Sequence, residues 1–259
     1  MKAIILAAGT GERLRPLTNH KPKCLVEIAG ISLLSRQIKT LKKAGITDIT
    51  VVAGYLADQI CQVSGINVIR NPKYDSTNMV ASLFCAREVM TGDEDLIISY
   101  GDIVYESKTL SPLLSSGSPI SIIIDLQWKR YWKLRMDNPL EDAETLKLDG
   151  EDLVRELGKK PKNYEEIQGQ YIGLIKIRFD QIKKIDDIYS SMDSKAIYDG
   201  KGFSNMYMTS FLQHLIDIGI PVRANLVNNG WLEVDTLQDY ELYNKMLEEG
   251  SLVNYYNPD

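Results

Sequence analysis

Short apolar runs separated by polar segments recur along the first half of the chain. Five of them are rich in β-branched residues and predict strands at residues 2–6, 49–53, 68–69, 96–100 and 120–124. Between the first four, apolar residues at helical spacing predict helices at 33–43, 56–63 and 79–90. Alternating buried strands and helices are typical of a parallel sheet covered on both faces.

The pattern changes after residue 124. Residues 137–156 carry eight acids, and further strands are expected at 171–177 and 222–227. Helices are expected at 179–189, 206–218 and 237–249, the last beginning after Thr236 as its N-cap. We therefore predict an α/β fold with a Rossmann-like, mostly parallel mixed sheet flanked by helices and a smaller lobe in the C-terminal half. Because no repeat or long linker interrupts it, the chain 1–259 is expected to be one domain.

Composition narrows the class of protein. Hydrophobic residues make up 44% of the chain and charged residues 25%, without any long apolar run, which excludes membrane spans and long disorder. The N-terminus lacks the apolar core and cleavage site of a secretory signal, so we expect a cytoplasmic protein. Cys24, Cys61 and Cys85 lie far apart without a C-x-x-C pair, which favours reduced thiols over a disulfide or zinc site.

Charge is distributed unevenly along the chain. The net charge of −5 argues against nucleic-acid binding, yet residues 1–43 carry nine Lys or Arg against two acids. That segment is +7 and the remainder −12. A helix face explains the lysines after residue 38, but four cations crowd a loop rich in Gly, Pro and Thr: Arg13, Arg15, Lys21 and Lys23. This cluster predicts a polyanionic ligand.

The loop after the first strand, LAAGTGERL at residues 6–14, carries the strongest chemical signal. Glycines at the carboxyl end of a strand let backbone N–H groups approach phosphates. A dinucleotide-binding loop would need a third glycine where Leu14 stands, and the P-loop sequence is absent. Lys21 and Lys23 flank Pro22 on a stretch predicted to be extended, so both are expected to face one phosphate chain.

This loop and later motifs resemble, in order, those of the nucleotidyltransferases that join a nucleoside triphosphate to a phosphorylated small molecule. The motifs are LAAGTGERLRPLT at 6–18, KPKCLV at 21–26, GD at 101–102, GKKP at 158–161, QYIG at 170–173 and GWLEVDT at 230–236. Further stretches look most like cytidylyltransferases acting on phosphocholine, phosphonates or phosphoglutamine: NMVASL at 78–83, WKRYWKLR at 128–135 and DAE at 142–144. The hexose-1-phosphate enzymes are less similar.

The resemblance implies that CTP and a small phosphorylated, amine-bearing acceptor react to give a CDP-linked product and pyrophosphate. Residues 1–124 would bind the nucleotide and residues 125–259 the acceptor. An acceptor phosphate carries about −1.5 to −2 charges and attacks phosphorus without a general base. This chemistry suits a chain with two histidines, His20 and His214, and no nucleophile–histidine arrangement. His214 is expected to be a core or surface residue, whereas His20 adjoins the basic loop and is equally a phosphate contact or a spacer.

Mg²⁺ is the expected cofactor because it is held by one or two carboxylates together with substrate phosphates. Asp102 follows a buried strand, where an acid needs a cationic partner. Asp235 shares a strand face with Glu233. The resemblance implies Asp102 and Asp235 as metal ligands, with Glu233 a weaker third. A capping role for Asp235 at the helix near Leu237 is the structural alternative.

The nucleotide-binding residues follow from the loop and the resemblance. Arg13 and Lys23 are expected to neutralise the triphosphate as catalytic residues, while Asn78 either reads the base or caps a helix. The full set expected at the nucleotide is Leu6, Ala8, Gly9, Thr10, Gly11, Glu12, Arg13, Lys23, Thr77, Asn78, Ser82 and Asp102.

The acceptor set is Trp128, Trp132, Glu144, Lys160, Tyr171 and Trp231. The resemblance places Lys160 on the acceptor phosphate, with Lys159 or a solvated role as alternatives. The aromatic residues, interpreted as lying near strand ends, would surround a cation or simply pack. Asp125, Asp142 and Glu144 either pair with an amine or form an acidic solvated loop.

Three rival functions stay open at this stage. One is transfer from UTP or dTTP to a hexose-1-phosphate. Another is a catalytically silent nucleotide sensor, which the paired acids Asp102 and Asp235 disfavour. The third is an NAD-dependent enzyme, which Leu14 disfavours. No nucleic acid or membrane partner is expected, and the sequence leaves open whether the chain is a homo-oligomer.

Overall fold

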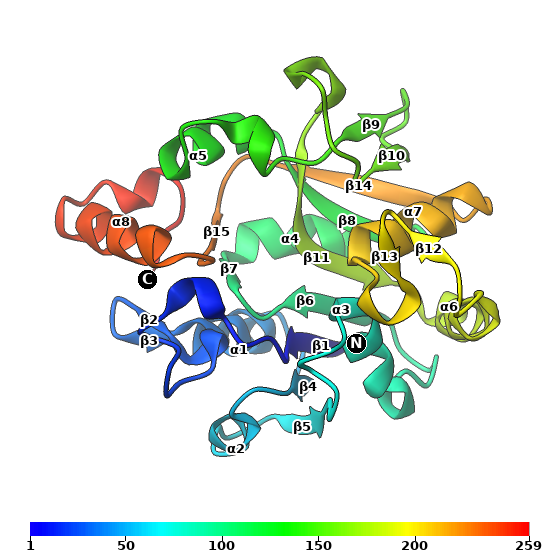
Figure 1. The fold of residues 1–259 in the computed structure, drawn as a ribbon, viewed down its shortest axis with the longest axis horizontal. Coiled ribbons are helices and arrows are strands. Elements are labelled where there is room, and N and C mark those ends of the chain that lie inside the picture. The colour runs from blue at the N-terminus through cyan, green and yellow to red at the C-terminus, as the bar shows by residue number, and fades with distance from the viewer. Residues whose placement is uncertain (259) are drawn as a thin grey trace.

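A central sheet of seven strands, in the order β14-β8-β11-β6-β1-β4-β5, organises the computed structural model, which describes residues 1–258 (Figure 1). These strands are β1 Lys2–Ala7, β4 Asp48–Ala53, β5 Asn67–Arg70, β6 Leu96–Tyr100, β8 Ile120–Asp125, β11 Gln170–Ile177 and β14 Val222–Val227. Neighbours run parallel except that β11 is antiparallel to both β6 and β8. The expected Rossmann-like, mostly parallel mixed sheet is confirmed.

Both faces of this sheet are buried. On β1, Ala3 and Ile5 enter one apolar cluster while Ile4 and Leu6 enter another, because successive side chains of a strand point to opposite faces. Helices α1, α4, α5 and α8 contribute to the first cluster, and α3, α6 and α7 to the second. Their bounds are α1 Leu33–Lys43, α3 Met79–Cys85, α4 Ser107–Ser115, α5 Trp128–Arg135, α6 Phe179–Ser191, α7 Met208–Asp217 and α8 Leu237–Glu248, with a short α2 at Ala57–Ile60.

Three separate two-stranded sheets lie outside the central sheet: β2 Glu27–Ile28 with β3 Ile31–Ser32, β9 Leu146–Leu148 with β10 Val154–Leu157, and β12 Ile197–Tyr198 with β13 Lys201–Gly202. The pair that matters for the site is β7 Ile103–Tyr105 with β15 Trp231–Glu233, which are antiparallel. The N–H of Val234 also donates to the carbonyl oxygen of Asp102, at 3.0 Å. This pairing places the segment after Trp231, which includes Asp235, beside Asp102.

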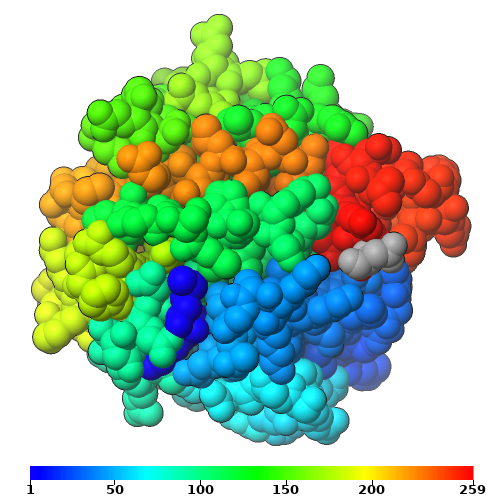
Figure 2. Space-filling model, turned by 180° about the vertical axis from the view of Figure 1, so that it is seen from behind, coloured from blue at the N-terminus to red at the C-terminus, as the bar shows by residue number. Residues whose placement is uncertain are grey.

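The C-terminal segment packs against helix α1. Arg36 on α1 donates hydrogen bonds to the carbonyl oxygens of Ile28 and Pro258. Seen from behind, the C-terminal segment lies directly against the N-terminal part of the chain (Figure 2). Among the described residues, no helix has the length and apolar character needed to cross a bilayer.

Several predicted elements differ from the structure. The helix expected at 56–63 is only Ala57–Ile60, and the helix expected at 79–90 ends at Cys85, with a 3-10 turn at Arg87–Val89 beyond it. The sequence did not predict α4 or α5. In α5, Trp128, Tyr131 and Trp132 lie at helical spacing and form its buried face. Trp128 and Trp132 therefore lie on a helix, which follows the end of β8 at Asp125.

Candidate active site

The loop after β1 is shaped by a glycine and packs against Lys23. Gly11 has a φ of +65°, and a Cβ there would lie 3.0 Å from the Cβ of Lys23. Thr18 holds the loop by donating from Oγ1 to the carbonyl oxygen of Gly11, at 2.7 Å. Glycine at position 11 thus allows both the left-handed turn and the close approach of the lysine.

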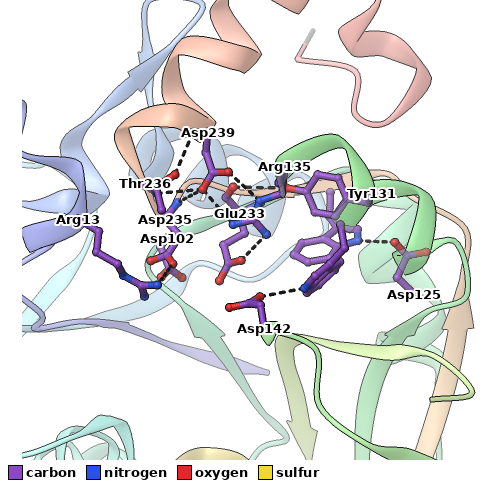
Figure 3. A network of polar contacts seen from close by, with 12 residues as sticks. Arg13, Asp102, Asp125, Tyr131, Arg135, Asp142, Glu233, Asp235, Thr236 and Asp239 are labelled. Carbon is purple, nitrogen blue, oxygen red and sulfur yellow. Dashed lines mark hydrogen bonds and ion pairs between the residues drawn. The ribbon is translucent and has the colours of Figure 1, made fainter. Parts of the chain in front are cut away.

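Lys23 lies between two carboxylates that are distant in sequence. Its Nζ donates to Asp102 Oδ2 at 2.8 Å and to Asp235 Oδ1 at 2.7 Å. Arg13 adds an ion pair to the other oxygen of Asp235, at 2.6 Å (Figure 3). Burial disfavours the charged form of Lys23, but Asp102, Asp235 and Glu233 outweigh it and raise the pKa of the ammonium above its usual value. Lys23 is therefore a permanent cation at this site.

A cavity of about 420 Å³ opens beside this cluster. Nine of the residues predicted at the nucleotide line it: Leu6, Gly9, Thr10, Gly11, Glu12, Arg13, Lys23, Asn78 and Asp102, together with the metal candidate Asp235. Ala7, Cys24, Met79 and Tyr100 complete the lining. The structure thus gathers the basic loop and both predicted metal carboxylates around one hollow.

Three predicted nucleotide residues lie behind this lining. The carbonyl oxygen of Ala8 accepts from the N–H of Tyr55 at 3.1 Å. Asn71 donates from Nδ2 to Thr77 Oγ1 at 2.9 Å and to Ser82 Oγ at 3.0 Å. Thr77 and Ser82 therefore support the segment that carries Asn78 into the cavity.

Asn78 caps a helix, which is one of the two roles that the sequence left open, and it also lies at the cavity. Its Oδ1 accepts from the N–H of Met79 at 2.8 Å, which caps α3. The same side chain lines the cavity. The cap leaves its amide nitrogen, which is 3.4 Å from the carbonyl oxygen of Asn205, at the edge of the hollow.

The two lysines of the KPK motif diverge. Lys23 begins a 3-10 turn at Lys23–Leu25, so the chain is not extended across both residues. The Nζ of Lys21 lies 3.6 Å from Glu27 at the surface, and Lys21 does not appear among the residues that line the cavity. The expectation that both lysines face one phosphate chain is wrong.

The carboxylates fit a cation such as Mg²⁺. Asp102 Oδ1 is buried and has no hydrogen-bond partner among the described residues. Within residues 1–258, no group of three or more Asp, Glu, His or Cys side chains is arranged to hold a metal by itself. Two carboxylates with an unpartnered oxygen match an ion that takes its other ligands from water and substrate phosphates.

A second cavity of about 180 Å³ adjoins the first, since Met79 and Tyr100 line both. Its acidic lining is Asp142, Glu144 and Glu233, and its aromatic lining is Tyr100, Trp132, Tyr171, Tyr207 and Trp231. Ile172, Gly173, Gln170, Met208 and Thr209 fill the remainder. Among the described residues, none that lines this cavity is Lys, Arg or His. In the part of the chain that the structure describes, the second cavity therefore has acids without a cation, whereas the first combines Arg13 and Lys23 with Glu12, Asp102 and Asp235.

Aspartates hold the two indoles of this wall. Trp132 donates from Nε1 to Asp142 and Trp231 from Nε1 to Asp125, both at 2.9 Å (Figure 3). Asp125 is fully buried, and burial raises its pKa against the bonds from Trp231 and backbone N–H groups. Asp125 thus fixes the wall and does not itself line the cavity.

Glu144 and Glu233 are the two acids of the second cavity whose pKa is raised toward neutral pH, in both cases mainly by burial. Burial raises the pKa of Glu144 to about 7, with added repulsion from Asp142, Asp199 and Glu233 and an opposing hydrogen bond from Thr209. A cationic ligand nearby would favour the ionised form.

Two predicted acceptor residues lie outside the second cavity. Trp128 is 4% exposed and packs against the Trp132 ring at a centroid distance of 6.0 Å. Lys160 donates from Nζ to the carbonyl oxygens of Leu140, at 2.8 Å, and Glu141. Trp132, Glu144, Tyr171 and Trp231 do line the cavity.

Sequence reasoning did not select Tyr100, Tyr207 or Thr209. Tyr100 had a usable signal, because it ends the strand that precedes Asp102. Tyr207 and Thr209 come from the start of α7, and only the tertiary fold brings them here. In the described part of the chain, neither histidine lines either cavity.

This architecture, with a glycine-rich basic loop after β1 and two carboxylates delivered from β6 and β15, defines a nucleotidyltransferase. A model of the MobA-like NTP transferase domain matches residues 3–131. CTP:phosphoglutamine cytidylyltransferase of Campylobacter jejuni is 43% identical over 250 residues, which cover 93% of this chain and 98% of that protein. The chain belongs to the nucleotidyltransferase family.

Other similarities lie in the same part of the family. Choline-phosphate cytidylyltransferase of Streptococcus pneumoniae is 44% identical over 91 residues, which are 34% of this chain and 40% of that protein. The solved structure of CTP:phosphocholine cytidylyltransferase from Streptococcus pneumoniae superposes with a TM-score of 0.69 at 24% identity, covering 95% of this chain and 98% of that one. That structure shares the fold described above.

Proposed function

We propose that this protein is a Mg²⁺-dependent cytidylyltransferase that transfers CMP from CTP to a small phosphorylated acceptor bearing an amine. An acceptor phosphate oxygen bonds to the α-phosphorus of CTP, the α–β phosphoanhydride bond breaks, and pyrophosphate leaves. The observation that carries this proposal is Lys23 held between Asp102 and Asp235, beside the loop that carries Arg13. Similarity to the phosphoglutamine and choline-phosphate enzymes supports CTP as the donor.

The first cavity supplies what the transfer needs. The reaction removes no proton from the acceptor, so a site built from cations and backbone N–H groups suffices. Lys23 and Arg13 neutralise the triphosphate and the charge that develops at the α-phosphorus. The loop at 9–12 and Asn78 contact the nucleotide. Asp102 and Asp235 would hold Mg²⁺, which supplies further positive charge against the phosphate oxygens.

Among the described residues, only the first of the two cavities is lined by cations, Arg13 and Lys23, and this difference would orient the acceptor. A phosphate would be repelled by Asp142, Glu144 and Glu233, whereas an amine or quaternary ammonium is attracted by these acids and by the aromatic wall. We therefore place the cationic end in the second cavity and the phosphate toward Lys23. In this arrangement the nucleotide part is about 1–124 and the acceptor part about 125–259, with Asp235, Met79 and Tyr100 crossing the division.

Lys160 provides a test of the acceptor arrangement. Its ammonium binds two carbonyl oxygens, and it would have to leave them to reach an acceptor phosphate. We assign the phosphate to Lys23 and Arg13, and Lys160→Ala measures any contribution of Lys160 as a rise in the acceptor KM.

Pyrophosphate release tests the function directly. CTP, UTP and dTTP are each combined with choline phosphate, aminoethylphosphonate, phosphoglutamine and glucose-1-phosphate, with and without Mg²⁺. Release with CTP and an amine-bearing acceptor is expected, and only when Mg²⁺ is present. Release only with glucose-1-phosphate and UTP or dTTP would establish the hexose-1-phosphate reaction instead. Nucleotide binding without release from any pair would identify a sensor.

A further inference from the structure

A buried ion pair lies directly behind the candidate metal carboxylate. Arg135 on α5 binds Asp239 on α8 through two parallel hydrogen bonds, Nε to Oδ1 at 2.8 Å and Nη2 to Oδ2 at 2.9 Å (Figure 3). Each side chain is 3% exposed. This bidentate geometry fixes the orientation of both groups.

The carboxylate of Asp239 also holds the backbone that carries Asp235. Its Oδ2 accepts from the N–H of Asp235 at 3.0 Å and from the N–H of Thr236 at 2.9 Å. The side chain of Asp235 then points the other way, to Lys23 and Arg13. A rotation of this backbone would therefore move the carboxylate of Asp235 relative to Asp102.

Arg135 reaches the acceptor side of the site as well. Its Nη1 donates to Glu233 Oε2 at 2.7 Å, and Glu233 lines the second cavity. The guanidinium carbon lies 5.3 Å from the ring centre of Tyr131 and 5.7 Å from that of Trp132. One side chain thus contacts an acid of the acceptor cavity and the acid behind Asp235.

The network also has a structural role, because Asp239 and Thr236 form the capping box at the start of α8. Removing two charges from water costs free energy, and apolar residues of similar size often stabilise a protein equally well. Asp239 and Arg135 do not line either cavity in the described residues, so they do not touch substrate in this arrangement. The network does define the position of two acids that face the cavities.

We propose that Asp239 and Arg135 are positioning residues: Asp239 orients Asp235 for the metal–nucleotide complex, and Arg135 links that orientation to Glu233 in the acceptor cavity. The inference rests on the proposed function, because it assigns Asp235 to the metal. It requires no contact between either residue and the substrates.

Mn²⁺ binding in the presence of CTP tests the role of Asp239 apart from turnover. Electron paramagnetic resonance of the full chain measures the Mn²⁺ affinity of the wild type and of D239A, D239N and R135K. Loss of a partner that orients a metal ligand weakens metal binding by about 10- to 100-fold, and we expect this for D239A. D239N keeps an oxygen for the two N–H groups and should lose less of the Mn²⁺ affinity.

Steady-state kinetics gives a second measurement. In D239A, kcat should fall in proportion to the Mn²⁺ affinity with little change in the acceptor KM, whereas R135K should also raise the acceptor KM.

Two variants separate positioning from general loosening. T236A removes the hydroxyl that accepts from the N–H of Asp239, at 3.1 Å, but leaves the bond from Asp239 to the Asp235 N–H. K176M removes another buried ion pair, Lys176 with Asp95 at 3.0 Å, outside both cavities. Both should bind Mn²⁺ with the wild-type affinity despite a lower unfolding midpoint.

The outcomes are distinct. Equal weakening of Mn²⁺ binding in D239A and T236A, or wild-type binding in D239A, would overturn the inference. If D239A does not fold, D239N and R135K decide in the same way. If the wild type transfers CMP and D239A binds Mn²⁺ with the wild-type affinity, the positioning role is refuted but the proposed function stands. A wild type that binds no Mn²⁺ with CTP would remove the proposed function as well.

Discussion

At the scale of single residues, the site is built from opposite charges that the fold forces together. The ammonium of Lys23 contacts both Asp102 and Asp235, and its positive charge offsets the repulsion between the two carboxylates. Arg13 is largely exposed while its partner Asp235 is not, so the arginine is the more movable member of the cluster. The buried lysine holds the two carboxylates together, and under the proposed function the exposed arginine would adjust to the phosphates of the nucleotide.

Replacing the central lysine should abolish most turnover while the chain still folds. Lys23→Ala removes the cation from a preorganised site, for which a loss of about 10²–10³-fold in kcat is the usual scale. Steady-state pyrophosphate release measures the effect, and far-ultraviolet circular dichroism checks the fold. Lys21→Ala is the matched control, because Lys21 pairs with Glu27 outside the cavity. Near-normal turnover in the Lys23 variant would contradict its assigned role.

The acceptor affinity should depend on pH through Glu144. Because burial raises the pKa of this carboxyl to about 7, its charged fraction falls as the pH falls. If the charged form binds the amine, the acceptor KM should rise about tenfold between roughly pH 8 and pH 6, in line with the lost ionised fraction. Steady-state kinetics across this range measures the change.

The variant E144Q keeps the size of the side chain but does not titrate. The acceptor phosphate titrates identically with either protein, so the difference between their pH profiles isolates Glu144. E144Q should show the higher KM throughout and a flatter profile. Parallel profiles for the two proteins would assign the pH dependence to another group.

At the scale of elements, the spacing of apolar residues predicted the strands and helices whose buried positions follow a regular pattern. The strands around β1 and the long helices α1, α6 and α8 were predicted closely, because continuous apolar runs and amphipathic stripes specify them locally. The antiparallel course of β11 has no local signature, since strand direction is set by the connections. Helix α5 was not predicted, although Trp128, Tyr131 and Trp132 lie at helical spacing and are buried.

The two cavities also differ in how far the sequence predicts their residues. The nucleotide loop is contiguous in sequence, so a single motif covers half of the residues that line the first cavity. The second cavity draws on segments from Met79 to Glu233, and its shape depends on which side of each element faces inward. The expectation that Lys21 joins Lys23 failed because a 3-10 turn, which the sequence does not signal, begins between them.

A close approach of two strand ends places Asp102, and Gly101 permits it. The N–H of Gly101 donates to the carbonyl oxygen of Leu6 at 2.8 Å, and a Cβ at position 101 would lie 2.7 Å from that oxygen. Gly101→Ala should therefore destabilise the protein by about 1–3 kcal/mol, the usual cost of overpacking. It should also displace Asp102 and lower turnover.

Urea unfolding and pyrophosphate release measure the two effects of this substitution. Gly117→Ala is the matched control, because a Cβ there would meet nothing within 4 Å. The control should keep wild-type activity. Equal stability of the two alanine variants would show that the strand ends do not need glycine.

At the scale of the whole molecule, the uneven charge of the sequence becomes a spatial arrangement. The positive N-terminal segment of residues 1–43 and acids from near the C-terminal end share one site, although they lie more than 200 residues apart. The strand pair β7–β15 makes this contact, and the C-terminal segment also packs against helix α1 (Figure 2). A ligand that bridges the cluster therefore contacts segments from the N-terminal and the C-terminal parts of the chain and should stabilise the whole fold.

Mg²⁺ and CTP together should raise the unfolding midpoint more than either does alone. A ligand at about 100 times its Kd contributes about 2.7 kcal/mol to the folded state, which corresponds to a shift of about 5–10 °C for a chain of this size. CTP alone brings its charge beside Asp102 and Asp235 with Lys23 and Arg13 as the only nearby cations among the described lining residues, so its shift should be smaller than with Mg²⁺. EDTA should remove the additional rise in unfolding midpoint that Mg²⁺ causes.

Substitution of the carboxylates tests where the metal binds. Because Asp102 Oδ1 is the unpartnered oxygen, D102N should respond to CTP equally with and without Mg²⁺. A Mg²⁺-dependent increment that survives in both D102N and D235N would place the metal elsewhere.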